Sequence, residues 1–331
     1  MNGFKSILIT GATGFVGAHL IRHFTPISSH VIGLGRKAPP EKLLKTGASY
    51  HLADLRSNAL PQEADIIIHS AGLASESADW DALYENNVIG TKNLLENVRY
   101  KLFIYISSAS VYPISDKPHR EDDLIQPKLL NDYGRSKYMA EEVVSKYPST
   151  VILRPRAIYG THDRVLLPKI LGLKKGNSIL TPCDVSNTVS LTNIINLIHA
   201  IELCIKKPSI AEKQVFNVSD GMTYILKDII AKLFYRIYDH EIPIRTIPYR
   251  ISKSISKLLT YLPIDTKLTK TSLDMICHNH VLSINKIRSV LSYSPDTNFE
   301  TYLPELVKWI EEVSVDRIIR NPSGAPWEMD E

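Results

Sequence analysis

The chain has 331 residues, of which 44% are hydrophobic and 22% are charged, and its formal net charge is +4. These values are ordinary for a globular protein, leave room for two lobes, and give no electrostatic argument for nucleic-acid binding. No uninterrupted apolar run is long enough to span a membrane, and the N-terminal segment leads into an apolar run, so we expect no signal peptide and a cytoplasmic location.

The first predicted strand, 6–10, runs into three glycines spaced three residues apart: Gly11, Gly14 and Gly17. Gly11 permits a tight strand-to-helix turn, Gly14 lets the backbone approach a pyrophosphate, and Gly17 lets the following helix pack closely on the sheet. The N-terminus of that helix offers N–H groups and a partial positive charge to phosphates. Glycines placed after a strand and before a helix therefore predict a dinucleotide-binding site.

The second predicted strand, 30–34, is followed by Arg36 and Lys37. An acidic side chain at this point of a dinucleotide-binding fold selects the ribose 2′-hydroxyl of NAD. A guanidinium beside an ammonium instead suits a 2′-phosphate, because Arg binds phosphate bidentately. The sequence therefore favours NADP(H) over NAD(H), although Arg36 stacked on the adenine would give the same pattern.

Apolar runs continue to alternate with helical patterns through the first half of the chain. Further strands are expected at 49–52, 65–69, 103–107 and 151–155, and the clearest helices at 82–98 and 133–146. Short, continuous runs rich in Ile and Val are typical of strands covered on both faces. The alternation predicts a parallel sheet with right-handed crossovers.

The rhythm changes after residue 160. Helices are expected at 165–173 and 193–205, a short strand at 215–218, and mainly helical structure from 225 onward. We therefore predict an α/β fold in which a Rossmann-type doubly wound parallel sheet is joined to a smaller, mainly helical C-terminal substrate lobe. The cofactor domain is placed at 1–160, completed by parts of 186–220, and the substrate-binding lobe at 161–331. Residues 321–326 are expected to be a tail with little reason to be ordered.

Three cysteines, Cys183, Cys204 and Cys277, lie far apart in the sequence. Their spacing suggests neither a pairing nor a metal site, which fits buried free thiols in a reducing compartment. Cys277 begins a short Cys-His-Asn-His run, but no second cluster accompanies it, so no metal is expected.

Tyr133 and Lys137 are four residues apart on a predicted helix and so share one face. A nearby ammonium favours the phenolate and makes the tyrosine useful for proton transfer. Ser107 and Ser108 stand where the preceding strand should end, which is where open α/β sheets bind ligands. A serine there can hydrogen-bond the substrate oxygen that the tyrosine protonates.

With these motifs the chain resembles the extended short-chain dehydrogenase/reductases, in the group called NAD-dependent epimerase/dehydratases. The matching pieces occur in the family's order and cover the first half densely, at 10–17, 54–55, 69–72, 87–91, 107–112, 133–137 and 154–160. Weaker matches follow at 215–221, 284–286 and 291–293.

The resemblance implies roles for individual residues. Tyr133 would be the general acid/base, Lys137 would hold the nicotinamide ribose and tune Tyr133, and Ser108 would polarise the substrate oxygen. Asp54 would accept from the adenine amino group with the Leu55 backbone alongside, and Asn87 would stabilise the strand ends or act only as a buried amide. The full set expected to contact the cofactor is Gly11, Thr13, Gly14, Phe15, Val16, Gly17, Arg36, Lys37, Asp54, Leu55, Ala71, Gly72, Asn87, Ser107, Tyr133, Lys137 and Pro155.

Two departures bear on the substrate. Nucleotide-sugar enzymes of this family usually carry an asparagine where this chain has Ala157, and a proline where it has Thr161. The resemblance is therefore stronger to the branch of 3β-hydroxysteroid dehydrogenases and related ketone reductases. In that branch an apolar helix such as 164–171 closes over the pocket, although simple helix packing explains the same pattern.

The favoured activity is hydride transfer between a nicotinamide and a secondary alcohol or ketone, possibly apolar. A nucleotide-sugar 4-epimerase or dehydratase, a thioester-reducing enzyme and a non-catalytic dinucleotide sensor are the alternatives. A homodimer through helices 82–98 and 133–146 is expected from the resemblance. The segment between residues 241 and 290 contains eight basic and three acidic residues. Within it, the basic, amphipathic segment 250–259 could lie on a membrane surface. It is interpreted instead as a helix of the substrate lobe.

Overall fold

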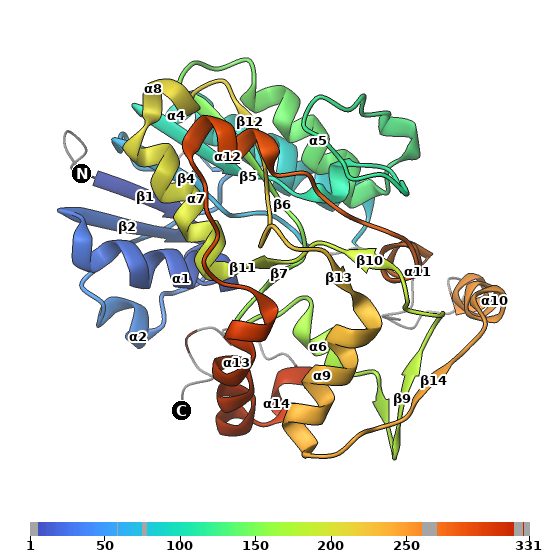
Figure 1. Cartoon of the computed structure of the whole chain (residues 1–331). Helices are drawn as coiled ribbons and strands as arrows, with labels where there is room; N and C mark the ends of the chain where they lie inside the picture. Colours follow the sequence, from blue (N-terminus) through green and yellow to red (C-terminus); the bar gives the residue numbers. More distant parts are fainter. Residues whose placement is uncertain (1–5, 58, 75–77, 260–269, 321–326, 328–331) are drawn as a thin grey trace.

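The computed structural model describes residues 6–57, 59–74, 78–259, 270–320 and 327. Its centre is a seven-stranded, wholly parallel sheet in the order β12-β6-β5-β4-β1-β2-β3 (Figure 1). The strands of this sheet are β1 (Ser6–Thr10), β2 (His30–Gly35), β3 (Ser49–Leu52), β4 (Ile66–His69), β5 (Leu102–Ile106), β6 (Thr150–Pro155) and β12 (Val215–Val218). The expected Rossmann-type parallel sheet is confirmed.

Both faces of the sheet are buried, as the Ile- and Val-rich strands predict. On β1, Ile7 and Ile9 face one apolar cluster and Leu8 faces another. The first cluster is completed by α1 (Phe15–Phe24) and α7 (Ile194–Lys206), and the second by α4 (Gly90–Asn97) and α5 (Asp132–Val144). Helices on both faces leave the carboxyl ends of the strands as the open edge at which a ligand binds.

The helix predicted at 82–98 is divided in the structure. It begins as α3 (Trp80–Tyr84), passes through a π-helical turn at Glu85–Ile89, and continues as α4. Asp79 caps its start by accepting from the Ala82 N–H at 2.7 Å. Single π-helical turns occur inside α-helices mainly at functional sites, and this one carries Asn87.

The C-terminal lobe lies below the sheet in Figure 1 and is mainly helical. Its own apolar core is formed by α6, α9, α13 and α14. The remaining elements of the chain are α2 (Glu41–Leu44), β7 (Ile158–Tyr159), α6 (Leu167–Leu171), β8 (Lys174–Lys175), β9 (Ser178–Thr181), β10 (Thr188–Val189), β11 (Thr192–Asn193), α8 (Pro208–Ala211), β13 (Tyr224–Ile225), α9 (Leu226–Tyr238), β14 (Ile244–Thr246), α10 (Tyr249–Leu259), α11 (Lys270–Cys277), α12 (Asn285–Leu291), α13 (Phe299–Val313) and α14 (Val315–Arg320).

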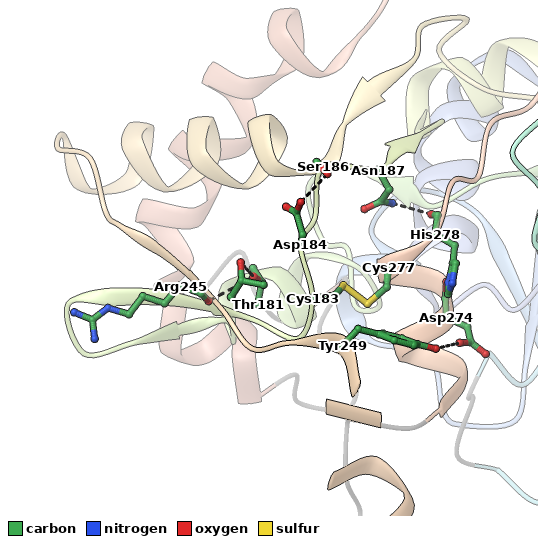
Figure 2. The surroundings of a disulfide bond; sticks show 11 residues. Thr181, Cys183, Asp184, Ser186, Asn187, Arg245, Tyr249, Asp274, Cys277 and His278 are labelled. Carbon is green, nitrogen blue, oxygen red and sulfur yellow. Dashed lines mark hydrogen bonds between the residues drawn. A yellow bond between two sulfur atoms is a disulfide. The ribbon is translucent and has the colours of Figure 1, made fainter. Parts of the chain in front are cut away.

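The cysteine prediction is wrong for two of the three residues. Cys183 and Cys277, 94 positions apart, form a disulfide that joins the segment after β9 to the end of α11 (Figure 2). Only tertiary packing brings these segments together, so sequence spacing carries no sign of the pair. Cys204 in α7 is the buried free thiol that was expected. Structural disulfides are rare in reducing compartments, so the cysteines no longer support a cytoplasmic location.

Two lobe helices bury different kinds of side chain. The apolar side chains of α6, including Leu167 and Leu171, pack into the lobe core. Helix α10 exposes apolar side chains and buries polar ones. Ile251 and Ile255 are exposed, whereas Ser252 and Ser256 are buried. In the described part of the chain, no helix is long and apolar enough to cross a bilayer.

The expected tail at 321–326 lies outside the described residues, but Trp327 just beyond it is described. Its side chain is buried in the apolar cluster around α1. The indole Nε1 donates to the Ala12 carbonyl at 3.2 Å, and the Arg22 guanidinium lies 4.4 Å from the ring centroid. A residue 315 positions away thus supports the glycine loop.

Candidate functional site

The glycine loop after β1 leaves no space for side chains. Gly11 has a φ of +69°, and a Cβ on it would lie 3.0 Å from the Ala71 backbone. A Cβ on Gly17 would lie 2.1 Å from the Gly11 carbonyl oxygen, an impossible contact. The Gly14 N–H donates to that same oxygen at 2.9 Å, which closes the turn. The loop is thus a bare backbone cradle against the sheet edge, and it fits a pyrophosphate.

The first turn of α1 faces this cradle. Gly14 is the N-cap and has no side-chain oxygen to occupy the first N–H groups of the helix. Thr13 and Val16 are partly buried, and Phe15 is buried with its side chain in the core. No acidic residue lies in the first turn, so the positive end of the helix dipole is available to an anion.

Arg36 and Lys37 follow β2 and are exposed. Arg36 Nη1 donates to Asn86 Oδ1 at 2.9 Å, and the Lys37 carbonyl accepts from the Tyr50 hydroxyl at 2.8 Å. The Asn86 contact, which the sequence did not indicate, ties the guanidinium to the π-helical turn.

Asp54 follows β3, and its carboxylate is engaged by its own neighbour. Arg56 donates through Nε and Nη2 to the two oxygens of Asp54, at 3.0 and 2.8 Å. These hydrogen bonds lower the pKa of Asp54 to about 2. Leu55 is buried beneath. A bidentate Arg56 leaves fewer lone pairs for an adenine amino group, which qualifies the role that the resemblance implies for Asp54.

A buried polar chain fixes the loop after β4. The Thr10 hydroxyl is 2.7 Å from His69 Nδ1, and His69 Nε2 is 2.9 Å from the Thr91 hydroxyl. Burial lowers the pKa of His69 to about 3, so its imidazole is neutral. Thr10 Oγ1 also accepts from the Ala71 N–H at 3.1 Å. The chain holds the Ala71 backbone against Gly11, beside the cradle.

Asn87 joins this loop to α5. Its Oδ1 accepts from the Leu73 N–H at 2.7 Å, and its Nδ2 donates to the Ser136 hydroxyl at 2.9 Å. A Cβ placed on Gly72 would be 3.1 Å from Asn87 Oδ1 and 4.0 Å from Lys137 Nζ. The loop after β4, the π-helical turn and the middle of α5 therefore converge.

Lys137 is buried at this convergence, one turn along α5 from the half-buried Tyr133. Its Nζ donates to the Ile106 carbonyl at 2.8 Å and lies 4.2 Å from the centroid of the Tyr105 ring. Burial lowers the pKa of Lys137 to about 7, and the Glu141 carboxylate opposes that shift. The ammonium is held at the very end of β5.

Ser108 lies just beyond the same strand end. It caps a 3₁₀ turn at Ala109–Val111, where its Oγ accepts from the Ser110 N–H and donates to the Ser110 hydroxyl, both at 3.1 Å. The Ile106 carbonyl accepts the hydrogen bond from Lys137, and Ser108 is only two residues further along the chain. The end of β5 therefore places Ser108 close to Lys137 of α5.

A buried ion pair supports these residues from behind. Glu141, one turn beyond Lys137, receives hydrogen bonds from Arg154 Nη2 at 2.6 Å and Nε at 3.0 Å. Ser107 Oγ donates to the same carboxylate at 2.5 Å, and Arg154 Nη1 donates to the Tyr112 hydroxyl at 2.8 Å. The pair locks α5 to β5 and β6. Glu141 was not predicted as a site residue, although its four-residue spacing from Lys137 places it on the same helix face.

The strand end of β6 completes the edge. Pro155 is buried, and Ala157 after it has a φ of +44°, in the left-handed region that asparagine tolerates better than alanine. An asparagine at this position would suit the left-handed backbone conformation. This chain keeps that conformation although it has alanine there and therefore lacks the side-chain amide. Helix α6 packs into the lobe core, and none of its residues lines the small cavity that lies beside Ser110.

A glycine cradle at the first strand end and a serine, tyrosine and lysine at the fifth define a Rossmann-type enzyme that uses a nicotinamide dinucleotide. Residues 7–219 match the NAD dependent epimerase/dehydratase family, and the chain belongs to that family. Its relatives include a dehydrogenase, an epimerase and a reductase.

Curated relatives include the decarboxylating sterol-4-alpha-carboxylate 3-dehydrogenase of Saccharomyces cerevisiae, which is 28% identical over 94% of this chain and 99% of its own length. The 2-alkyl-3-oxoalkanoate reductase of Stenotrophomonas maltophilia is 27% identical over 91% of this chain and 98% of its own. The structure of UDP-glucuronic acid 4-epimerase from Bacillus cereus with NAD superimposes with a TM-score of 0.73, at 21% identity, over 93% of this chain and 97% of the other. That likeness concerns the fold.

Proposed function

We propose that this enzyme transfers hydride between a nicotinamide dinucleotide and a secondary alcohol or ketone, with Tyr133 as the general acid/base. The observation that supports it most is the convergence around Lys137. The glycine loop touches the Ala71 backbone, Gly72 approaches Lys137, and Lys137 is held at the strand end that carries Ser108. The dinucleotide, when bound, supplies or accepts the hydride.

The residues of this chain then divide the remaining work. The Tyr133 phenol exchanges a proton with the substrate oxygen, and the Ser108 hydroxyl, which donates to Ser110 in the structure, turns to donate to that oxygen. Lys137 favours the phenolate and holds the nicotinamide ribose. The residues assigned to contact the pyrophosphate are Gly11, Thr13, Gly14, Phe15, Val16 and Gly17. The adenosine would contact Arg36, Lys37, Asp54 and Leu55. The nicotinamide end would contact Ala71, Gly72, Asn87, Ser107 and Pro155.

Replacement of Tyr133 by phenylalanine tests the assignment. We expect kcat to fall about 10²- to 10⁴-fold, the usual contribution of a positioned acid/base, with the Kd of the dinucleotide nearly unchanged. Tyr138→Phe removes a hydroxyl from the same helix and serves as the matched control. A Tyr133→Phe enzyme with the kcat of the wild type would overturn the proposal.

The cofactor is proposed to be NADP(H) in preference to NAD(H). Arg36 and Lys37 stand exposed after β2, and the Asn86 contact holds the Arg36 guanidinium at the sheet edge. Arg36→Met should weaken NADP⁺ binding by about tenfold or more, since a charge-assisted phosphate contact is lost, and leave NAD⁺ binding unchanged. Titration of both cofactors measures this, and tighter binding of NAD⁺ by the wild type would overturn the preference.

A nucleotide-sugar 4-epimerase is the second candidate, supported by the overall likeness to the Bacillus cereus epimerase. An epimerase returns the hydride to its substrate, so it produces no net change in reduced nicotinamide. A steady rise or fall of the nicotinamide absorbance with hydroxy or keto compounds would exclude it.

The division of labour between lobes is part of the proposal. Residues 1–160, with parts of 186–220, would bind the cofactor, and 161–331 would bind an apolar hydroxy or keto substrate. A homodimer through α4 and α5, which pack side by side, is also proposed and can be checked by analytical ultracentrifugation. The cytoplasmic location stays a prediction.

A further inference from the structure

Helix α10 turns its apolar side chains away from the protein. Ile251 and Ile255, one turn apart on the same stripe of the helix, are 52% and 39% exposed, and neither belongs to the lobe core. Ser252 and Ser256, on the next stripe, are buried instead, and the helix packs on α11. Within the described part of the chain, the buried Ser252 hydroxyl has no hydrogen-bond partner. Small polar side chains thus make the inner contact, and the isoleucines are left for a partner outside the lobe.

The exposed side of α10 is also basic. The helix contains Arg250, Lys253 and Lys257 and no acidic residue. Arg250 and Lys253 are exposed and lie three residues apart, so they are neighbours on the helix surface. Asp274 of the adjacent α11 is half-buried, and its carboxylate accepts from the Tyr249 hydroxyl at 3.1 Å (Figure 2). An exposed apolar stripe therefore runs beside a stripe of positive charge.

The position of α10 makes this surface accessible. The helix lies at the outer edge of the lobe, beyond α11 as seen from the parallel sheet (Figure 1). The segment 241–290, which contains it, has eight basic and three acidic residues, so the surrounding charge has the same sign. A surface of this kind attracts an extended anionic partner before any apolar contact is made.

An anionic lipid surface fits both stripes at once. A helix that lies on a bilayer buries its apolar side chains at the boundary of the acyl chains and keeps its Lys and Arg at the headgroups. A second copy of this chain fits less well. A two-fold contact through Ile251 and Ile255 would bring Arg250 and Lys253 of both copies together, and like charges across an interface repel.

We infer that α10 is a docking helix through which the protein binds reversibly to membranes that contain anionic lipids. Ile251 and Ile255 enter the headgroup region, and Arg250 and Lys253 contact the lipid phosphates. Two isoleucines bury little area and two cations add a modest attraction, so the attachment is peripheral and sensitive to salt.

Vesicle flotation of the full chain tests this inference. Vesicles of phosphatidylcholine with about one third phosphatidylglycerol would be compared with vesicles of phosphatidylcholine alone. We expect binding to the anionic vesicles to be about tenfold tighter or more, and high salt to abolish the difference. Replacing Ile251 and Ile255 together by serine should weaken binding to the anionic vesicles about tenfold. Replacing Arg250 and Lys253 together by glutamine should reduce it to the level of the neutral vesicles.

A matched control removes the same side chains elsewhere. Ile195 and Ile225 are 46% and 44% exposed, and their joint replacement by serine should leave vesicle binding unchanged. All these positions are exposed, and urea denaturation of each variant checks that its fold is kept. Absence of vesicle binding by the wild type, equal binding to both kinds of vesicle, or full binding by the Ile251/Ile255 variant would overturn the inference. A dimer that the Ile251/Ile255 variant loses in analytical ultracentrifugation, without vesicle binding by the wild type, would assign the stripe to a second copy and overturn it too.

Discussion

The two halves of this molecule are held together by different forces. In the sheet half, a buried ion pair and a buried lysine lie at the ends of β5 and β6, and a chain of buried hydroxyls and an imidazole joins the ends of β1 and β4 to α4. In the lobe, α6, α9, α13 and α14 share an apolar core, a disulfide joins two segments, and ion pairs such as Lys232–Glu300 are exposed. The polar groups of the sheet half therefore both stabilise and position the chemistry. The lobe is stabilised mainly by apolar packing and by the disulfide.

The largest effect is expected at the buried ion pair. Glu141→Gln leaves Arg154 buried without its counter-charge, which costs about 3–5 kcal/mol of unfolding free energy. The matched change in the lobe, Glu300→Gln, breaks an exposed pair worth at most about 1 kcal/mol. Urea denaturation of both variants measures the difference. Equal losses would show that the contrast between the halves is not energetic.

The disulfide comes next. Replacing Cys183 and Cys277 together by serine should lower stability by about 2–4 kcal/mol, because the unfolded chain regains the freedom of a long loop. Dinucleotide affinity should not change, since both cysteines belong to the lobe.

Thiol titration of the denatured protein checks the pairing itself. One thiol, Cys204, should react before reduction and three after it. Three reactive thiols without reductant would show that the lobe is held by apolar packing alone.

The smallest effect is a pH dependence at Lys137. Its pKa in the folded protein is about 7 against an ordinary value of 10.5, so between these pH values the unfolded chain binds more protons. Stability should therefore rise with pH across this window, by at most about 1.4 kcal/mol per pH unit. Lys137→Met should flatten that slope, and the exposed Lys146→Met should not. Denaturation midpoints at pH 7 and pH 9.5 give the comparison, and parallel slopes in the two variants would contradict it.

The sequence predicted the sheet half well for a physical reason. A strand buried on both faces must be apolar throughout, so its ends are visible, and the expected bounds of all six early strands fall within one residue of the structure. The glycine loop is equally easy to recognise in the sequence. No other residue type fits at position 17, because a Cβ there would collide with the Gly11 carbonyl oxygen.

What the sequence left open depends on distant segments. The Cys183–Cys277 bond, the Asn86 contact of Arg36 and the inward serines of α10 all follow from tertiary packing. The small cavity bordered by Ser110 and Arg156 is another example, because Asp274 and His280 reach it from more than a hundred residues downstream. Local pattern cannot report such neighbours.

Trp327 has a consequence for how the protein is made. The indole that donates to Ala12 leaves the ribosome long after the glycine loop does, since 315 residues separate them. Domains fold from the N-terminus as they are synthesised, and contacts this remote close last. The nascent glycine loop must therefore wait, with one of its carbonyls unsupported, until the substrate lobe has emerged. A chain halted before residue 327 would have every glycine of the loop in place and still lack the indole that supports it.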